Sequence, residues 1–355
     1  MKRYISVKLS FKLGITVTLT YLVECVFMTQ LVNIRKIIRV GERSAGITIP
    51  KEWLSYLNVD IGSSVEVTLG PGYILIRPLI SSISQPRTIN AITLKHDDLE
   101  QLERLIIGSY IEGYDVITLD VSRNIARNVF YKISTRLPGI ISMNGDVFKI
   151  KISVDELNTD LNDILNSMKS TVSSMFDILL EYFDTGNIEK LKELLKLDDD
   201  LDRFHFLGMR TIRRTSYKDP IAALENTIVI KSLEHIGDTL DRVSNTFLKM
   251  MLNVIEKSEC RESLKEIFTK VSSYVSKAIN SFISHNINQA LKVLLQREEL
   301  SREILDRASK CINVTGILAV SHEAMVSVYE AAEIAEIAVL RYLRELGLEH
   351  KQSKE

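Results

Sequence analysis

The chain has 355 residues, of which 45% are hydrophobic and 26% are charged, and its formal net charge is −1. This composition supplies enough apolar residues for a sizeable core, which excludes a disordered tail protein, a collagen-like fibre and a disulfide-rich miniprotein. The length exceeds the usual domain size of about 100–200 residues, so we expect two or three domains. Because the overall charge is near zero, any contact with nucleic acid has to come from a local basic patch.

The cysteines are Cys25, Cys260 and Cys311, which are widely spaced and odd in number. This spacing predicts neither a disulfide framework nor a CxxC metal site. It is typical of a protein of the reducing cytoplasm, and we predict that location.

Residues 1–28 contain several basic residues followed by an apolar run. Glu24 interrupts the run, which is shorter than the roughly 20 residues of a membrane span, and no small-residue cleavage site follows it. We therefore predict no stable membrane insertion. We interpret 1–28 as a dispensable extension or a misassigned start, with Met28 as the working initiator; an extra strand or an interfacial anchor is the alternative.

Residues 33–78 alternate short apolar runs with turn sequences. The predicted elements are strands at 34–40, 46–49, 64–69 and 73–77, with a short helix beginning at Pro50 after the second strand. About fifty residues of this kind form a very thin core alone, so we expect this unit to pair with a second copy.

Residues 88–153 give a strand at 88–94, a helix at 97–113, a strand at 115–119, a helix at 123–136 and a hairpin that turns at 144–145. This pattern indicates a small α/β module. It contains no phosphate-binding loop and no catalytic grouping, and we interpret it as a connector or a dimerisation module.

The second half of the chain is predicted to be helical. Ten of the 15 glycines and five of the six prolines precede residue 151, and apolar residues recur at spacings of three and four from residue 155 onward. Breaks near 185–186, 216–220, 257–259, 285–286 and 314–316 divide the region into about six long helices. The segments beginning at Asn187 and Asn286 align without gaps over 17 residues, with five identities, which favours two three-helix repeats.

Acidic residues on two of these helices form a candidate metal site. An acidic run ends at Asp202 on the second helix, and the four-residue spacing of Glu234 and Asp238 places both on one face of the third. Such oxygens suit a divalent or ferric ion. The candidate ligands are Asp199, Asp200, Asp202, Glu234 and Asp238. The alternative is a solvated acidic face that nearby arginines neutralise, namely Arg203, Arg210, Arg213 and Arg214.

The second repeat offers a weaker set of acids. Of two alignments of its third helix, neither keeps counterparts of both Glu234 and Asp238. Its candidate ligands are Glu298, Glu299, Glu330 and Glu333. A di-iron oxidase bundle would need two Glu-x-x-His pairs, and the segment 202–205 alone approximates one. No nucleophile–base pair, Walker loop or dinucleotide fingerprint occurs, so we do not expect an enzyme.

A local basic patch lies near residue 40. Four basic residues crowd one predicted strand and its turn, so two copies related by a two-fold axis would present eight cations to the phosphates of a duplex. A charged, solvated edge strand is the alternative. The candidate DNA-binding residues, including one at the start of the short helix, are Arg35, Lys36, Arg39, Arg43 and Lys51.

Three segments of the first unit, with the sequences IRKIIRVG, ITIPKEWL and IGSSVEV, resemble the AbrB/MazE/SpoVT swapped-hairpin DNA-binding domain. That family forms dimers that present basic residues of the first strand and the following loop to DNA. The resemblance implies this role for Arg35, Arg39 and Arg43.

Residues 233–238, LEHIGD, resemble the LERIGD signature of the PhoU family, and 199–203, DDLDR, resemble its second acidic motif. The family consists of two three-helix repeats, binds metal clusters through these acids and restrains phosphate uptake. The chain as a whole is similar to archaeal phosphate-uptake regulators of this family.

The predicted fold is multidomain. After the 1–28 extension come a β-rich head at 29–80, an α/β spacer module at 86–153 and an all-α, PhoU-like body at 155–346, with repeats at about 155–257 and 259–346. We predict a homodimeric, phosphate-responsive regulator that binds DNA through the head and metal through the body.

Two other functions fit the same pattern. The first is an adaptor that docks on a phosphate transporter or its signalling protein, with the head used for dimerisation alone. The second is a metal-storage or redox bundle. Steeply salt-dependent DNA affinity distinguishes the regulator from the adaptor.

Overall fold

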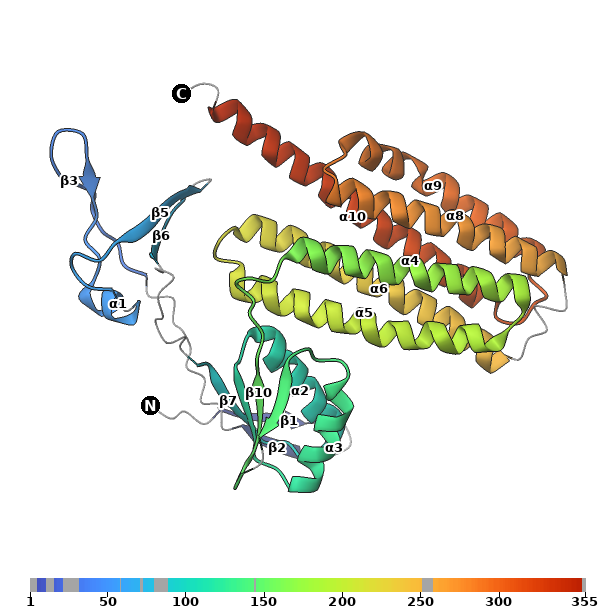
Figure 1. Ribbon diagram of the computed structural model, residues 1–355, viewed down its shortest axis with the longest axis horizontal. Helices are drawn as coiled ribbons and strands as arrows, with labels where there is room; N and C mark the ends of the chain where they lie inside the picture. Colours follow the sequence, from blue (N-terminus) through green and yellow to red (C-terminus); the bar gives the residue numbers. More distant parts are fainter. Residues whose placement is uncertain are drawn as a thin grey trace. The chain divides into compact units, whose positions relative to one another are not determined.

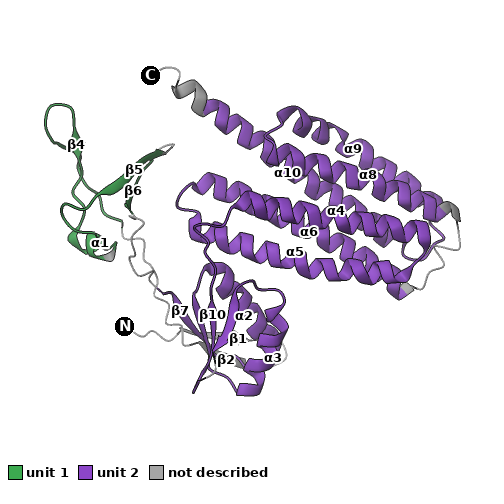
Figure 2. Cartoon of the chain, in the orientation of Figure 1, with its two compact units in different colours: residues 1–87 green, residues 88–355 purple. Residues whose placement is uncertain are grey.

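The computed structural model describes residues 5–10, 16–21, 32–57, 59–70, 73–79, 89–143, 145–250 and 258–352. Two compact units make up the chain, residues 1–87 and 88–355, coloured green and purple in Figure 2. Strands dominate the first unit, whereas the second consists of an α/β module followed by long helices (Figure 1).

The first unit begins with β1 (Ile5–Ser10) and β2 (Thr16–Tyr21), which pair antiparallel with Ile5 opposite Tyr21. The described residues of 1–28 thus form a hairpin of two strands. Met28 lies outside the described residues.

The head follows the predicted order of strand, strand, helix, strand, strand. Its elements are β3 (Ile38–Arg39), β4 (Ala45–Gly46), α1 (Lys51–Tyr56), β5 (Val65–Gly70) and β6 (Tyr73–Pro78). Pro50 precedes α1 as its N-cap residue instead of occupying the first turn. The pairs β3–β4 and β5–β6 are separate two-stranded sheets. The strands β5 and β6 have about the predicted length, whereas β3 and β4, with two residues each, are shorter than predicted.

The head buries almost none of its apolar side chains. Among its described residues Val59, at 8% exposure, is the buried hydrophobic one, whereas Ile34, Ile61 and Leu69 are 93%, 99% and 82% exposed. One copy of the head thus lacks a core of its own, as its length predicts.

The α/β module contains a four-stranded sheet of order β7-β8-β10-β9. Its elements are β7 (Ala91–Leu94), α2 (Leu99–Glu112), β8 (Val116–Leu119), α3 (Arg123–Ser134), β9 (Ile140–Met143) and β10 (Phe148–Ile152). The strands β7 and β8 are parallel, and β10 pairs antiparallel with β8 and β9. The side chain of Asp98 caps α2 by accepting from the Gln101 amide at 2.8 Å. The predicted order of elements is thus present.

The described part of the body consists of six long helices, which end near the predicted breaks. They are α4 (Leu161–Thr185), α5 (Ile188–Thr215), α6 (Pro220–Met250), α8 (Ser258–Ile283), α9 (Ile287–Lys310) and α10 (Ile317–Gln352). Asn187 and Asn286, the first residues of the two aligned segments, cap α5 and α9 through their side-chain oxygens, which supports the repeat. Among the helices that the structure describes, none combines the length and apolar character needed to cross a lipid bilayer.

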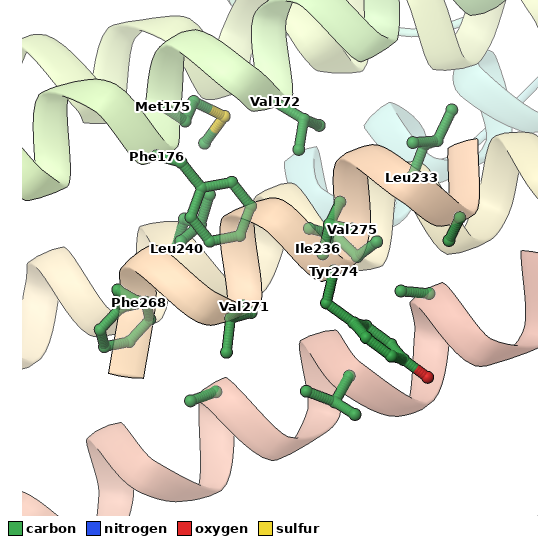
Figure 3. Close-up of a cluster of buried hydrophobic side chains, with 14 of the residues drawn as sticks. Val172, Met175, Phe176, Leu233, Ile236, Leu240, Phe268, Val271, Tyr274 and Val275 are labelled. Carbon is green, nitrogen blue, oxygen red and sulfur yellow. The ribbon is translucent and has the colours of Figure 1, made fainter. Parts of the chain in front are cut away.

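The two repeats share one hydrophobic core. Figure 3 shows Phe176 of α4, Ile236 of α6 and Val271 of α8 among the side chains that meet between the repeats. All three are at most 1% exposed. The helical body is therefore one packed unit rather than two bundles in series.

The α/β module packs directly against α5. Phe206 of α5 belongs to the core of the module. Arg210 of α5 is fully buried; its guanidinium donates to Glu156 Oε1 at 2.5 Å and to the carbonyls of Tyr110 and Tyr114 at 2.7 and 2.9 Å. The module, which the sequence indicates to be a connector or a dimerisation module, is thus fixed to the first repeat by buried, charge-assisted hydrogen bonds.

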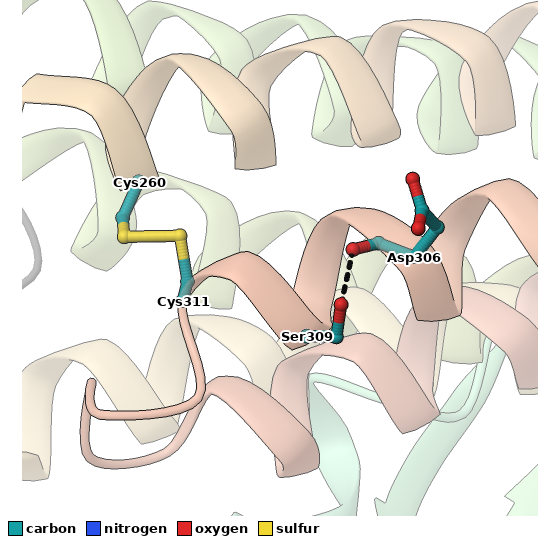
Figure 4. Close-up of a disulfide and its surroundings, with 4 residues drawn as sticks. All are labelled: Cys260, Asp306, Ser309 and Cys311. Carbon is teal, nitrogen blue, oxygen red and sulfur yellow. Dashed lines mark hydrogen bonds between the residues drawn. A yellow bond between two sulfur atoms is a disulfide. The ribbon is translucent and has the colours of Figure 1, made fainter.

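A disulfide joins Cys260, in the first turn of α8, to Cys311 at the end of α9 (Figure 4). The Cα atoms are 5.7 Å apart, and both residues are buried. The prediction that these cysteines stay unpaired was wrong, because packing of α8 on α9 brings together residues 51 positions apart. The cysteine content therefore no longer supports a reducing compartment. Cys25 lies outside the described residues.

Candidate functional site

Two glycines allow α5 and α6 to approach closely. A Cβ atom at Gly208 would lie 2.7 Å from Ile230 Cδ1, and one at Gly237 would overlap Leu201 Cδ2. Asp198 Oδ1 lies 3.8 Å from the place that a Gly237 Cβ would take. The helices are antiparallel at this contact, so acids on one helix face acids on the other.

The facing surfaces carry the same spacing on both helices. Asp198, Asp202 and His205 follow one another at intervals of four and three on α5, as do Glu234, Asp238 and Asp241 on α6. This spacing aligns side chains along one stripe of a helix. We call the five carboxylates the acid cluster: Asp198, Asp202, Glu234, Asp238 and Asp241.

The carboxylates perturb one another strongly. Burial, followed by the charges of Asp241, Asp202 and other acids, raises the pKa of Asp198 to about 7. Burial and the charge of Asp238 raise the pKa of Glu234 to about 6. Burial is also the largest cause that raises the pKa values of Asp202 and Asp241. The cluster therefore favours binding of protons or cations.

Two arginines already contact the cluster. Arg136 of the α/β module donates from Nε to Asp202 Oδ2 at 2.8 Å, and Arg242 donates from Nη1 to Asp238 Oδ2 at 3.3 Å. Within the described ranges no ion pair reaches Asp198. The negative charge of the cluster is thus neutralised in part.

His205 lies beside the cluster and is 6% exposed. Its Nδ1 has no hydrogen-bond partner in the part of the chain that the structure describes and lies 3.7 Å from Glu234 Oε2. Burial lowers the pKa of His205 to about 4, so the ring is neutral at pH 7. A neutral imidazole nitrogen beside carboxylate oxygens is a donor set that fits a divalent transition-metal ion.

The predicted ligands are partly brought together. Asp202, Glu234 and Asp238 lie in the cluster, whereas Asp199 and Asp200 are exposed, and Asp200 pairs with Arg203 at 3.6 Å. As the described side chains stand, no three histidine, cysteine or carboxylate groups are close enough to hold a metal ion.

Sequence reasoning did not select two acids of the cluster, Asp198 and Asp241, nor His205. The four-residue spacing from Asp198 to Asp202 was an available signal. The alternative interpretation named four arginines that could neutralise these acids. Arg203 pairs with Asp200, whereas three contact the α/β module instead: Arg210, Arg213 and Arg214.

The second repeat has no equivalent cluster in the described residues. At the offset of 99, Arg297 occupies the place of Asp198, and Ser301 that of Asp202. Arg297 lies 3.8 Å from Glu336 Oε1 and its guanidinium is 5.8 Å from the Tyr329 ring centroid. The second repeat thus has the positive charge of Arg297 at the position where the first repeat has the carboxylate of Asp198.

The weaker candidates of the second repeat are dispersed. Glu298 pairs with Arg297 at 3.1 Å, and Glu330 contacts His235 Nδ1 at 3.2 Å. Glu299 lines a hollow between α8 and α9, and Glu333 lines another between α6 and α10. These four residues do not form one site.

The predicted DNA-binding side chains are exposed. Arg35, Lys36, Arg39 and Arg43 lie on β3 and the segments beside it, and Lys51 is the first residue of α1. Arg39 Nε donates to the Gly41 carbonyl at 3.1 Å, and Gly41 turns the chain with a φ of 81°. The basic residues therefore remain accessible from solvent in one copy of the head.

Comparisons with known proteins identify two domains. Residues 165–246 match the family model of the PhoU domain, and residues 38–84 match that of MazE, a bacterial antitoxin of antidote–toxin recognition. No curated protein sequence matches the chain.

Solved structures similar to the chain include two PhoU proteins. The phosphate transport system regulatory protein PhoU from Streptococcus pneumoniae has 12% identity and a TM-score of 0.41, over 50% of this chain and 88% of that one. PhoU from Pseudomonas aeruginosa has 16% identity and a TM-score of 0.41, over 52% of this chain and 92% of that one. From the two family models, the chain joins a MazE-type domain to a PhoU domain, and the acid cluster lies within the residues of the PhoU domain.

Proposed function

We propose that this protein is a phosphate-responsive transcriptional regulator that restrains phosphate uptake. The observation that carries the proposal is the presence of a MazE-type domain and a PhoU domain in one chain, at 38–84 and 165–246. The role is regulatory rather than catalytic. Because the proposed ligand is DNA, we assign the protein to the cytoplasm.

The head would bind DNA as a homodimer. Its exposed apolar residues, such as Ile61 and Leu69, need a partner surface, and a second copy supplies an identical one. A two-fold dimer would double the exposed cations near β3 and present them to the phosphates of a duplex.

The body would bind a divalent or ferric ion at the acid cluster. Asp202, Glu234 and Asp238 would supply oxygen ligands together with Asp198 and Asp241, and His205 Nδ1 would supply a nitrogen. The ion would contribute the positive charge that these residues lack. Because Arg136 and Arg242 occupy Asp202 and Asp238, the acids would turn from these partners to hold it.

Fluorescence anisotropy of the full chain tests the DNA-binding role. The probes are the DNA upstream of the protein's own gene, that of a phosphate-transport operon and a scrambled duplex, each titrated across salt. We expect sub-micromolar affinity that falls steeply with salt and is lost in the variant Arg35→Ala/Arg39→Ala/Arg43→Ala. The matched control is Lys149→Ala/Lys151→Ala on β10, which removes exposed charge outside the head.

Binding no tighter than to the scrambled duplex would contradict the regulator. It would favour the adaptor, in which the helical body contacts a phosphate transporter or its signalling protein and the head holds two copies together.

A further inference from the structure

The end of α3 places a guanidinium between two helices of the second unit. Arg136 Nε and Nη2 lie 2.8 and 2.6 Å from Asp202 Oδ2 on α5, while Nη1 lies 3.3 Å from Glu103 Oε1 on α2. Its guanidinium carbon is also 5.4 Å from the centre of the Phe206 ring. Arg136 therefore connects the acid cluster to the α/β module.

Two further features show that the site keeps polar atoms without partners among the described residues. His205 Nδ1 is buried beside Glu234 and has no hydrogen-bond partner among the described residues. Asp198 faces other carboxylates, and no ion pair reaches it in the same part of the chain. The site therefore contains potential metal ligands that neither Arg136 nor Arg242 contacts.

We propose that Arg136 is a tethered counter-ion of the acid cluster and that a soluble divalent cation displaces it from Asp202. The inference rests on the metal site of the proposed function and adds its regulation. Binding of the cation then competes with the contact of Arg136, at the end of α3, with Asp202 of α5. Because such coupling is reciprocal, undocking of Arg136 raises cation affinity as much as the cation favours undocking.

The surrounding contacts permit this exchange at low cost. Glu103 keeps a second partner, Lys132 Nζ at 2.5 Å, when Arg136 leaves. Arg210 continues to hold the module on α5 through Glu156 and two backbone carbonyls. Displacement therefore frees the end of α3 without detaching the whole module.

Mn²⁺ titration of the full chain, with free Mn²⁺ followed by electron paramagnetic resonance, tests the proposal. We expect Arg136→Gln to bind Mn²⁺ about fivefold tighter or more, the lower range of ordinary coupling. Arg136→Lys, which keeps the charge, should stay near the wild-type affinity. Arg213→Gln is the matched control, because Arg213 also pairs with α2, at Glu112, and does not contact the cluster.

Amide hydrogen exchange gives an independent measurement on the wild type. Saturating Mn²⁺ should increase exchange at the end of α3 and leave the strands β8 and β10 protected. Equal Mn²⁺ affinity in the wild type and Arg136→Gln, or unchanged exchange in α3, would overturn the proposal while leaving the metal site in place. Absence of Mn²⁺ binding in every variant would overturn both the proposal and the metal site.

Discussion

Asp198 makes the largest single contribution of the acid cluster to the pH dependence of stability, since its pKa is raised further than that of Glu234. Burial and neighbouring carboxylates raise its pKa to about 7, whereas an unfolded chain releases this proton near pH ~4. The folded protein therefore binds the proton more tightly, and the stabilisation present below the unfolded pKa is lost as the pH rises through 7.

In metal-free protein we expect the free energy of unfolding to fall by about 1–2 kcal/mol between pH 5 and pH 8, since solvent partly screens the cluster. Asp198→Asn should reduce this fall, and Glu234, whose pKa is raised to about 6, should retain part of it. Urea unfolding at both pH values in the presence of a chelator measures it. The control is Asp200→Asn on the exposed side of α5; an equal effect of both variants would contradict the assignment to Asp198.

Single residues also show where sequence reasoning reaches its limit. The spacing of Glu234 and Asp238 predicted that they share a helix face, because helical geometry is local. Arg210 could not be assigned this way: the residues of the α/β module that its guanidinium contacts, Tyr110 and Asp115, are 100 and 95 residues away, and nothing in the local pattern distinguishes it from Arg203. Hydrogen-bond partners that lie in another domain depend on how the domains pack, which the local sequence does not specify.

At the scale of elements, the close approach of α5 and α6 sets the geometry of the cluster. Gly237→Ala would place a Cβ against Leu201, and overpacking of this kind costs about 1–3 kcal/mol. We expect that loss in the free energy of unfolding, measured by urea denaturation. Gly108→Ala in α2 is the control: no atom lies within 4 Å of its Cβ, so helix propensity should make it neutral or stabilising by up to ~1 kcal/mol. Equal stability of the Gly237 variant and the wild type would contradict this packing.

The disulfide is a second link between elements. Cys260 and Cys311 close a segment with a sequence separation of 51, and a cross-link of that span stabilises a protein by about 2–4 kcal/mol. Reduction, or Cys260→Ser/Cys311→Ser, should lower the melting temperature measured by circular dichroism. Reductant should not change the melting temperature of the double variant. If reductant also leaves the melting temperature of the wild type unchanged, the disulfide does not stabilise the fold.

Helices and strands differ in how well the sequence predicts them. The six helices of the body lie at the predicted breaks because the apolar stripe, Gly186 and the caps at Asn187 and Asn286 are all local signals. The strands β3 and β4 are much shorter than their apolar runs suggest. Strand length depends on pairing partners, which the local sequence does not specify.

For the whole molecule, the two repeats have one fold and different charges. Asn187 and Asn286 start equivalent helices, yet Arg297 stands in the place of Asp198. The second repeat thus carries internally the positive charge that the first repeat must obtain from Arg136, Arg242 or a soluble ion. Under the proposed function, the described residues offer one cation site per chain, and a two-copy assembly would present two.

The whole molecule is expected to form a dimer through the strand β5. Alternate residues of β5 present an apolar face, with Val65, Val67 and Leu69 exposed by 41%, 61% and 82%. Burial of such a face in a second copy would supply the core that one head lacks. Light scattering after size exclusion should give a mass twice the 40.4 kDa of one chain.

Val67→Lys/Leu69→Lys should dissociate this dimer at micromolar concentration and abolish salt-sensitive DNA binding, because each monomer keeps half of the cations. Helix content by circular dichroism should not change, since the helices of the body have their own core. Thr68→Lys, on the opposite face of β5, is the matched control and should remain dimeric. If the double variant stays dimeric while Thr68→Lys dissociates, the two copies pair through the other face of the strand.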